Sequence, residues 1–416
     1  MISAPDFDKK QIVFVFFKDG EKLAFSNDNM IIKDPDGKIK LQITCYRLFI
    51  VYAVGNFSIT SVLLQKAEKF GFFIALLTGN FRLYGLIGAQ KDSNTLLKKK
   101  QYKYDSLDAA KHLTKNKIKN QELLLSSVRR KSDAQIEAIQ KIREYYSQID
   151  YANDLHHIMG YEGLASRAYF KNYFNNVQWN CREPRIKRDY VNSTLDIGYT
   201  ILFSLIDSLL EAFGFDTYCG VMHRQFYMRK SLVCDLIEPF RCIIDKQIKK
   251  SINLKQIKQD DFILINNQYR LNIKKNPDYA KILFTPILEC KNDIFLYIRT
   301  YYRSFMKDID THEFPTFYIY DEDWKMIIIS YDISDDKKRN KFSKYIKRFG
   351  HRLQYSVYEI ENSDKILNNI VTDIKNKYSK VFDQYDSVYI FKMSNSCEIE
   401  KFGYAKNEDS ELIIVK

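Results

Sequence analysis

Glycine and proline are scarce in this chain, with 14 and 7 residues among 416. This composition excludes collagen-like repeats and long flexible linkers, because both depend on these two residues. The seven cysteines are an odd number, and no two of them form a Cys-x-x-Cys pair. That pattern argues against a zinc ribbon and against a disulfide framework, and it predicts reduced thiols in the cytoplasm.

Long apolar runs and nucleotide-binding loops are also missing. The segment MISAPDFDKK lacks the basic-then-apolar pattern of a secretion signal, and the apolar run over residues 70–77 is too short to span a bilayer. We therefore expect no membrane partner. No Gly-x-x-x-x-Gly-Lys-Ser/Thr loop occurs, so ATP hydrolysis is not expected to drive a reaction.

Positive charge is what the chain has in excess. Lys and Arg outnumber Asp and Glu by 65 to 52, which gives a formal net charge of +13. Such a charge favours a polyanionic partner, and nucleic acid is the first candidate. Thirty tyrosines contribute to a high aromatic fraction of 15%, and tyrosines on a basic surface can stack on bases as well as fill cores.

Residues 1–100 predict a small, mostly β domain. Between residues 11 and 54, short stretches of β-branched and aromatic residues alternate with turn residues, which predicts a meander of antiparallel strands. Residues 59–69 switch to helical spacing and end at Gly71, and residues 72–77 predict a buried strand.

Residues 101–310 predict a helical domain. Apolar residues recur at three- and four-residue steps over residues 107–113, 123–146 and 195–213. A basic cluster consists of Arg182, Arg185, Lys187 and Arg188. The cluster is either a solvated face or part of a track for phosphates, and its position beside the candidate site described below favours the track.

Residues 311–325 are interpreted as a connector, and residues 326–416 read like a separate protein, which suggests a fusion of two genes. The expected elements there are a strand over 327–331, a helix capped by Ser334 and closed by Gly350, a strand over 353–360, a second helix capped by Ser363, and a strand over 387–391. This order predicts a ferredoxin-like α+β sandwich. The tail ELIIVK can add an edge strand to another sheet.

A candidate metal site combines two carboxylates and one imidazole. Asp235 and Glu238 are three residues apart, so on a helix they share a face with Arg241, which could simply neutralise them. Pro239 lies within this run and predicts a kink. His223 lies among apolar residues, where a structural role in the core is the simpler interpretation.

Glu162 is the second carboxylate of the candidate site. Gly160 and Gly163 bracket it, and we expect these small residues to let another helix approach and to pin the glutamate in an interface that a cation must neutralise. Two carboxylates and an imidazole suit Mg²⁺ or Mn²⁺. Such an ion aligns a hydroxyl for in-line attack on a phosphodiester, so the sequence predicts phosphodiester chemistry.

At these residues the chain resembles Cas1, the CRISPR adaptation integrase, over about residues 10 to 300. The segments that carry the resemblance, in the family's order, are Gly160-Tyr161-Glu162-Gly163, Asp189 with Asn192, Gly198-Tyr199, Gly220 with His223, and the run from Asp235 to Arg241. The resemblance implies that Glu162, His223 and Glu238 coordinate a catalytic metal, with Asp235 in support.

The C-terminal part resembles Cas2, the partner of that integrase. The run Gln354-Tyr355-Ser356-Val357-Tyr358-Glu359 resembles the family's Gln-x-Ser-Val-Phe-Glu. The resemblance implies that two copies pair, and that Asp332 is a metal ligand for nuclease activity, although we favour a structural acid at a strand end. The basic helix that begins with Lys337, Lys338 and Arg339 would bind duplex phosphates without reading sequence.

Together these patterns predict a metal-dependent integrase that joins prespacer duplexes to the repeat and leader of a CRISPR array, with the C-terminal dimer as a DNA-spanning bridge. The resemblance implies a homo-oligomer through dimers of both parts. Complexes of the family hold two integrase dimers around one partner dimer, whereas a fusion supplies equal numbers of the two parts. Either some C-terminal domains are unused in the complex, or the connector is cut, or the assembly differs. Two other classes stay open, a nuclease that only hydrolyses DNA or RNA and a non-catalytic architectural DNA-binding protein.

Overall fold

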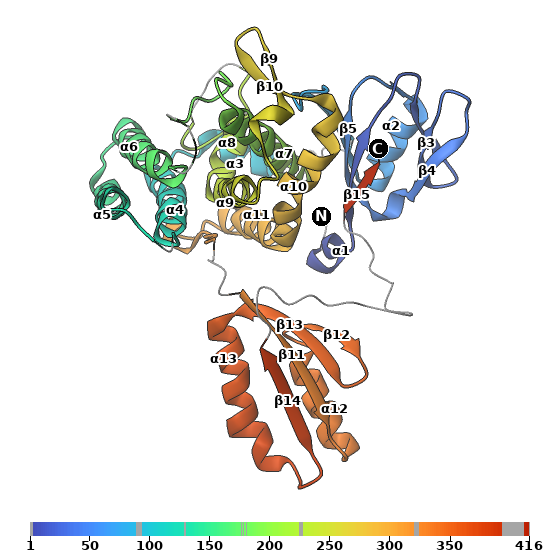
Figure 1. Ribbon diagram of the computed structural model, residues 1–416, viewed down its shortest axis with the longest axis vertical. Helices are drawn as coiled ribbons and strands as arrows, with labels where there is room; N and C mark the ends of the chain where they lie inside the picture. The colour runs from blue at the N-terminus through green and yellow to red at the C-terminus, as the bar shows by residue number, and fades with distance from the viewer. Residues whose placement is uncertain are drawn as a thin grey trace. The chain divides into compact units, whose positions relative to one another are not determined.

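The computed structural model describes residues 3–88, 94–128, 130–175, 177, 179, 181–223, 228–319, 324–392 and 412–415. The chain divides into two compact units. The first unit contains residues 1–319 with 410–416, and the second contains residues 320–409. The first unit is strand-rich at its N-terminal end and helical beyond it, and the second unit combines strands and helices (Figure 1).

Two sheets form the strand-rich end of the first unit. The five-stranded sheet has the order β15-β1-β5-β7-β8, and the four-stranded sheet has the order β4-β3-β2-β6. The elements are α1 (Ala4–Asp8), β1 (Gln11–Phe16), β2 (Lys22–Ser26), β3 (Asn29–Lys33), β4 (Ile39–Thr44), β5 (Leu48–Val54), β6 (Ser58–Ile59), α2 (Ser61–Phe70), β7 (Phe73–Leu77), β8 (Leu83–Gly88) and β15 (Leu412–Val415).

The expected antiparallel meander over residues 11–54 is wrong in part. Strands β2, β3 and β4 are antiparallel, but β1, β5 and β7 run parallel in the other sheet. Every residue of β5 is buried, as is typical of a parallel strand covered on both faces. The expected helix α2 is confirmed, and it ends at Gly71, whose φ of 70° is left-handed.

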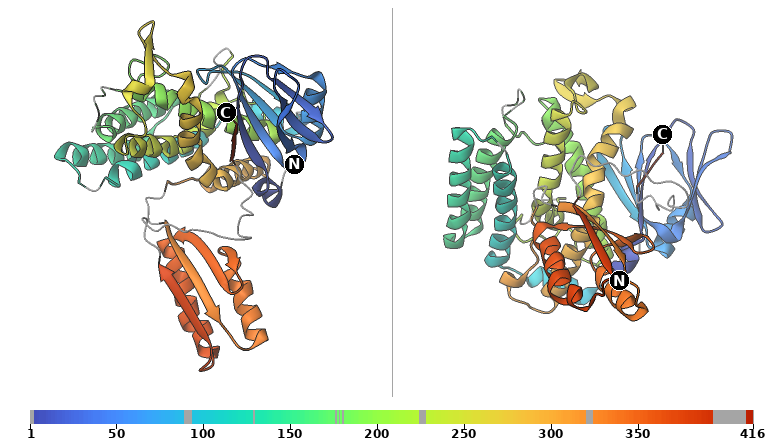
Figure 2. Two further views of the ribbon diagram at one scale, coloured as in Figure 1. Left: turned by 45° about the vertical axis from the view of Figure 1, so that its right-hand side comes forward. Right: turned by 60° about the horizontal axis from the view of Figure 1, so that its bottom comes forward.

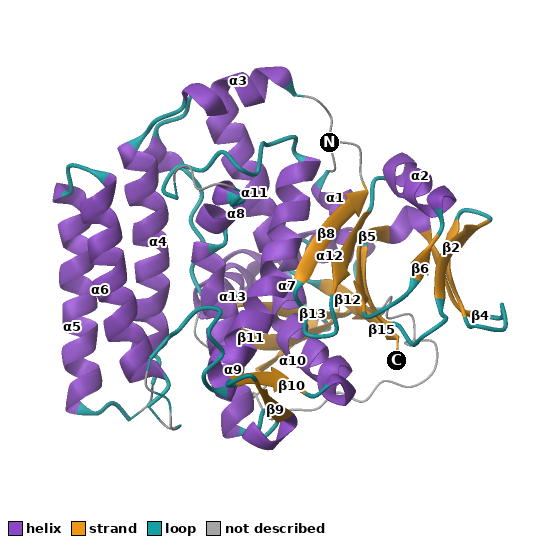
Figure 3. Cartoon of the chain, turned by 90° about the horizontal axis from the view of Figure 1, so that it is seen from above, coloured by secondary structure: helices purple, strands orange, loops and turns teal. Residues whose placement is uncertain are grey.

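Helices build the rest of the first unit. They are α3 (Thr95–Lys103), α4 (Leu107–Ser126), α5 (Asp133–Gln148), α6 (Leu155–Tyr173), α7 (Tyr190–Ala212), α8 (Ser231–Leu236), α9 (Arg241–Asn253), α10 (Asn276–Glu289) and α11 (Lys291–Met306). Helices α4, α5 and α6 lie side by side at one end (Figure 3). The single helix expected over residues 123–146 is wrong, because α4 ends at Ser126 and a capping box of Ser132 and Gln135 starts α5.

Helix α7 is central to this helical core. By length and composition it could cross a membrane, yet 83% of its most apolar window is buried inside the protein. A buried core helix has the same composition, so α7 is weak evidence for a membrane span.

An antiparallel hairpin, which was not expected from the sequence, lies between helices α9 and α10. Strands β9 (Phe262–Ile265) and β10 (Gln268–Leu271) pair around Asn266 and Asn267, whose φ angles of 50° and 60° are left-handed. Asparagine tolerates this conformation, so the pair supports a two-residue turn. The hairpin stands out from the surrounding helices (Figure 2).

The segment after α11 packs on helix α4. Phe314, Phe317 and Ile319 are buried. The side chain of Asn116 hydrogen-bonds both the N–H and the C=O of Phe317, and that of Asn120 accepts from the N–H of Ile319. Residues 320–323 of the interpreted connector lie outside the described residues.

The second unit has one antiparallel sheet with the order β12-β13-β11-β14. Its elements are β11 (Trp324–Asp332), α12 (Asp336–Ile346), β12 (His351–Gln354), β13 (Val357–Ser363), α13 (Asp364–Asp373) and β14 (Ser387–Lys392). Helix α12 buries Phe342 and Ile346 in the core of this unit.

Two local expectations for the second unit are wrong. The strand expected over residues 353–360 is a hairpin, because Ser356 adopts a left-handed φ of 64° and breaks it. The N-cap of α12 is Asp335, which accepts from the N–H of Lys338 at 2.8 Å, whereas the Ser334 hydroxyl donates to Asp386. Aspartate and serine are both good caps, so the sequence did not distinguish them.

The C-terminal strand returns to the first unit. Strand β15 pairs in parallel with β1, from Ile12 opposite Leu412 to Val15 opposite Val415. This confirms that the tail adds an edge strand, and β1 is its partner.

Candidate active-site cleft

A cleft of about 1840 Å³ opens in the first unit, lined mostly by its helical part and also by residues 78 and 80–83 of its strand-rich part. Ten Lys and Arg residues line it against four Asp and Glu residues, so its field favours anions. Glu162, His223 and Glu238 all line this cleft, although they are far apart in sequence. Three of the four basic residues of the predicted DNA track, Arg182, Arg185 and Lys187, line it too.

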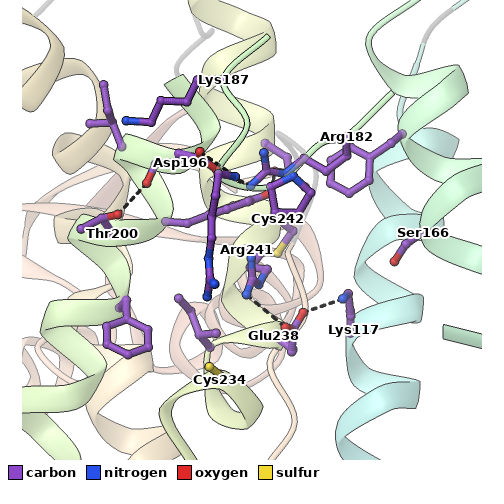
Figure 4. Close-up of a pocket in the computed structure, with 18 of the residues that line it drawn as sticks. Lys117, Ser166, Arg182, Lys187, Asp196, Thr200, Cys234, Glu238, Arg241 and Cys242 are labelled. Carbon is purple, nitrogen blue, oxygen red and sulfur yellow. Dashed lines mark hydrogen bonds and ion pairs between the residues drawn. The ribbon is translucent and has the colours of Figure 1, made fainter. Parts of the chain in front are cut away.

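Glu238 is buried at the point where two helices meet. Pro239 follows it in a short 3-10 turn, η3 (Glu238–Phe240), which separates α8 from α9. The Glu238 carboxylate lies between two cations, with Oε1 3.1 Å from Nη2 of Arg241 and Oε2 2.6 Å from Nζ of Lys117 (Figure 4). Burial alone would raise the pKa of Glu238, but Arg241 and Lys117 lower it to about 2, so the group is ionised at neutral pH.

Lys117 joins the two carboxylates of the candidate site. Its ammonium forms ion pairs with both Glu162 and Glu238, and its side chain is only 13% exposed. Burial lowers the pKa of Lys117, yet the two glutamates outweigh burial and raise it. Sequence reasoning missed this residue, because a lysine in helix α4 looks like part of a solvated face.

Glu162 reaches the cleft from helix α6, on a face that also carries Ser166. The Ser166 hydroxyl donates to Oε1 of Glu162 at 3.0 Å. The expectation that Gly160 and Gly163 admit another helix is wrong. A Cβ on either glycine would meet no atom within 4 Å, and Gly163 lines the cleft. These glycines leave open space beside Glu162.

Asp235 holds His223 and does not itself line the cleft. Its Oδ1 accepts from the N–H of His223 at 3.0 Å and lies 2.6 Å from Nδ1 of the ring. Its Oδ2 accepts from the N–H groups of Val221 and Met222. A Cβ on Gly220 would lie 2.7 Å from this Oδ2, so only glycine lets the backbone approach the carboxylate. The aspartate therefore orients the imidazole.

These side chains fit a hard divalent cation in their chemistry. Glu238 Oε2 is buried, and its approach to Lys117 does not have the geometry of a hydrogen bond. The Nε2 atom of His223 has no hydrogen-bond partner among the described residues. Within the described part of the chain, no three His, Cys, Asp or Glu side chains already form a metal cluster. The ammonium of Lys117 lies between the carboxylates, where a cation would satisfy both.

A buried polar network of Tyr169, Tyr199 and Asp245 lies next to Arg241. Tyr169 and Tyr199 donate their hydroxyls to Asp245. The guanidinium of Arg241 lies 4.6 Å from the centre of the Tyr199 ring. Burial raises the pKa of Asp245 to about 6 against the effect of these donors. The network thus holds the guanidinium of Arg241 in place beside Glu238.

The predicted DNA-binding residues differ in what they contact. Arg182 pairs with Asp196 at 2.6 Å, whereas Arg188 does not line the cleft and pairs with Glu183 at 3.1 Å.

In the second unit, Asp332 is exposed at the end of β11. Of the basic residues predicted on α12, Lys338 pairs with Asp383 at 2.7 Å and Arg339 pairs with Asp336.

Both parts of the chain match families of CRISPR-associated proteins. The Cas1 model matches residues 14–283, and the Cas2 model matches residues 325–400. The chain belongs to the Cas1 family and carries a Cas2 domain fused at its C-terminal side. A protein of Thermodesulfovibrio yellowstonii named CRISPR-associated endonuclease Cas1 is 31% identical over 252 residues, 58% of this chain and 78% of that protein. One of Leptospira interrogans is 29% identical over 238 residues, 51% of this chain and 94% of that protein.

Solved structures share the fold. A chain of a Cas6-RT-Cas1–Cas2 complex has a TM-score of 0.65 at 20% identity, over 75% of this chain and 36% of that chain. A Cas1 protein from Thermotoga maritima has a TM-score of 0.62 at 16% identity, over 75% of this chain and 100% of that chain. A casposase bound to an integration product has a TM-score of 0.61 at 18% identity, over 81% of this chain and 99% of that chain.

Proposed function

We propose that this chain is a metal-dependent DNA integrase of the cytoplasm that inserts prespacer duplexes into a CRISPR array. The observation that carries the proposal is the buried, ionised Glu238 in a basic cleft that Glu162 and His223 also line. The names of the relatives, CRISPR-associated endonucleases, support chemistry on nucleic acid. The similar casposase, which is bound to an integration product, supports strand joining.

Glu162, Glu238 and Nε2 of His223 would hold Mg²⁺ or Mn²⁺. When bound, such an ion polarises a phosphoryl oxygen and aligns the attacking hydroxyl. Asp235 keeps the His223 ring in one orientation through Nδ1. Arg182, Arg185 and Lys187 would hold the phosphate backbone along the cleft.

The reaction exchanges one phosphodiester for another. The 3′-hydroxyl of a prespacer strand loses its proton and forms a bond to phosphorus at the repeat boundary. The bond from that phosphorus to the 3′ oxygen of the array strand breaks, and this oxygen takes up a proton. Because the number of phosphodiesters is unchanged, no ATP is needed.

The deciding experiment supplies a supercoiled plasmid that carries the repeat and leader, a labelled duplex with 3′-hydroxyl ends, and Mg²⁺ or Mn²⁺. Glu162→Ala should reduce joining by more than about 100-fold, because loss of a residue that merely orients a metal ligand already costs roughly 10–100-fold in activity. Its affinity for the duplex should stay close to that of the wild type. Glu137→Ala, which removes an exposed glutamate paired with Lys141, is the matched control and should join normally. Joining at the normal rate by Glu162→Ala would refute the metal assignment.

A nuclease is the second candidate, because the names of the relatives specify endonucleases. The same site could use water in place of the 3′-hydroxyl. Release of short products from the plasmid without incorporation of label would identify hydrolysis. If the same products formed in the presence of EDTA, neither metal-dependent enzyme would explain them. If the chain bound the DNA but formed no product, it would be an architectural protein.

We further propose that the second unit is a ferredoxin-like bridge that pairs with another copy. The β-α-β-β-α-β order and the antiparallel strand order support this assignment. Integrase dimers and paired second units would then form a homo-oligomer on double-stranded DNA. Native mass spectrometry of the DNA-bound assembly would measure the number of copies, and a monomeric assembly would refute the bridge.

A further inference from the structure

The hairpin of β9 and β10 carries exposed apolar side chains beside a basic cleft. Ile263, Leu264 and Ile265 are 49%, 59% and 41% exposed, although they are consecutive residues of one strand. At the base of the hairpin, Phe262 and Leu271 are buried, so the hairpin is rooted in the core while its upper part stands free. Figure 2 shows it projecting from the helices.

The register of the hairpin divides its side chains between two faces. Arg270 lies opposite Ile263, and Gln268 lies opposite Ile265, so these four share one face. Gln268 and Arg270 line the cleft. The two isoleucines therefore extend the wall of the cleft outward, whereas Leu264 lies on the opposite face with Tyr269.

Arg270 is available to bind an anion. No carboxylate of the described residues forms an ion pair with it, and its polar contact is a 3.5 Å hydrogen bond to Gln268. Its hairpin is tied to the basic segment of the cleft, because the N–H of Tyr269 donates to the carbonyl of Lys187 at 2.8 Å. The hairpin backbone that carries Arg270 and the two isoleucines is thus held beside the cleft.

We propose that this face of the hairpin, made of Ile263, Ile265, Gln268 and Arg270, is a DNA-contacting surface. Arg270 binds a backbone phosphate, and the two isoleucines pack against sugars and base edges of the same duplex, as apolar side chains do in DNA-distorting proteins. The inference rests on the proposed function, since it places DNA in the cleft. A second protein copy fits less well, because four side chains cannot supply the roughly 1,000 Å² that a specific interface buries.

The test measures binding of a fluorescein-labelled DNA duplex to the full chain by anisotropy over a range of NaCl concentrations. Ile263→Ser combined with Ile265→Ser should raise Kd by about tenfold, the effect of losing a central contact. The slope of log K against log salt should not change, because no charge is removed. Arg270→Gln should raise Kd and also reduce this slope by about one.

Leu264→Ser is the matched control. Leu264 is the most exposed of the three apolar residues but lies on the other face, so its loss should leave Kd and slope unchanged. An equal effect of Leu264→Ser, or wild-type affinity in the double variant, would overturn the proposal. The proposal would also be overturned if the double isoleucine variant kept its DNA affinity but had a different oligomeric mass in the absence of DNA. That result would assign the face to contact with a second copy of the chain. If the wild-type chain bound no duplex at any salt concentration, the proposed function would fail first and the hairpin proposal with it.

Discussion

Lys117 is a buried cation that links two carboxylates of the candidate active-site cleft. It connects α4 to α6 through Glu162 and to the α8–α9 junction through Glu238. Without a cation at this position, the buried Glu238 carboxylate would keep Arg241 but lose its second partner. The lysine thus stabilises the same two acids that the proposed divalent cation would bind.

Lys117→Met should lower the free energy of unfolding of the metal-free protein by about 3 kcal/mol, because it removes one of the two cations that pair with the buried carboxylate of Glu238. Added Mg²⁺ should then raise the Tm more in the variant than in the wild type, since no ammonium has to leave the carboxylates. Calorimetry in EDTA and in Mg²⁺ measures both effects.

Lys115→Met on the same helix is the control for that prediction. Lys115 pairs with Asp150 at 2.7 Å, but the aspartate is 56% exposed, so solvent screens the pair. The loss should cost at most about 1 kcal/mol. Equal losses in the two variants would show that Lys117 has no special role.

At the scale of elements, α4 connects the cleft to the segment that leads toward the second unit. Asn120 donates to the carbonyls of Pro239 and Phe317, both at 2.9 Å, and accepts from the N–H of Ile319 at 2.8 Å. One amide therefore holds the turn that carries Glu238 and the extended segment over residues 314–319. Lys117 lies one turn earlier on the same helix.

Asn120→Ala should destabilise the protein by about 2 kcal/mol, because it leaves the N–H of Ile319 without a partner, whereas the carbonyls of Phe317 and Pro239 keep other donors. Hydrogen exchange should become faster at the amide of Ile319. Denaturant unfolding and exchange mass spectrometry measure the two effects. Asn172→Ala, which removes only a bond to the carbonyl of Ala168 in its own helix, should cost about 0.5 kcal/mol or less. Unchanged exchange at Ile319 in Asn120→Ala would contradict the role given to this amide.

Local patterns predicted elements best where neighbours in sequence decide the structure. Helix α2 and its glycine stop follow from spacing and from the conformational freedom of Gly71. The hairpin β12–β13 did not follow, because its break depends on the left-handed backbone of Ser356, which serine adopts only under tertiary constraint. The parallel pairing of β1 with β5 could not be predicted either, because it depends on contacts between residues that are distant in sequence.

In the molecule as a whole, the C-terminal end of the chain pairs with its N-terminal end, because β15 lies in parallel beside β1. This strand covers the edge that β1 would otherwise leave open, and it comes from the opposite end of the sequence. An uncovered edge strand can pair with other chains, so β15 also protects the sheet.

Truncation after residue 409 should uncover β1. Amide exchange in residues 11–16 should become faster while that of β5, which keeps both neighbours, changes little. Exchange mass spectrometry of the two proteins compares the peptides directly, and light scattering would detect any new self-association. Unchanged exchange in β1 would show that β15 does not cover this edge in solution.

Periodicity, turn residues and motif spacing are local properties, so they were enough to predict the helical and strand-rich regions, the separate C-terminal part, and Glu162 and Glu238 among the four acids that line the cleft. Which groups surround these two glutamates was set by the tertiary structure. It placed Lys117 between Glu162 and Glu238, assigned Asp235 to orient His223, and set the hairpin face beside the basic cleft. These are contacts between residues distant in sequence, and no local pattern encodes the packing that brings them together.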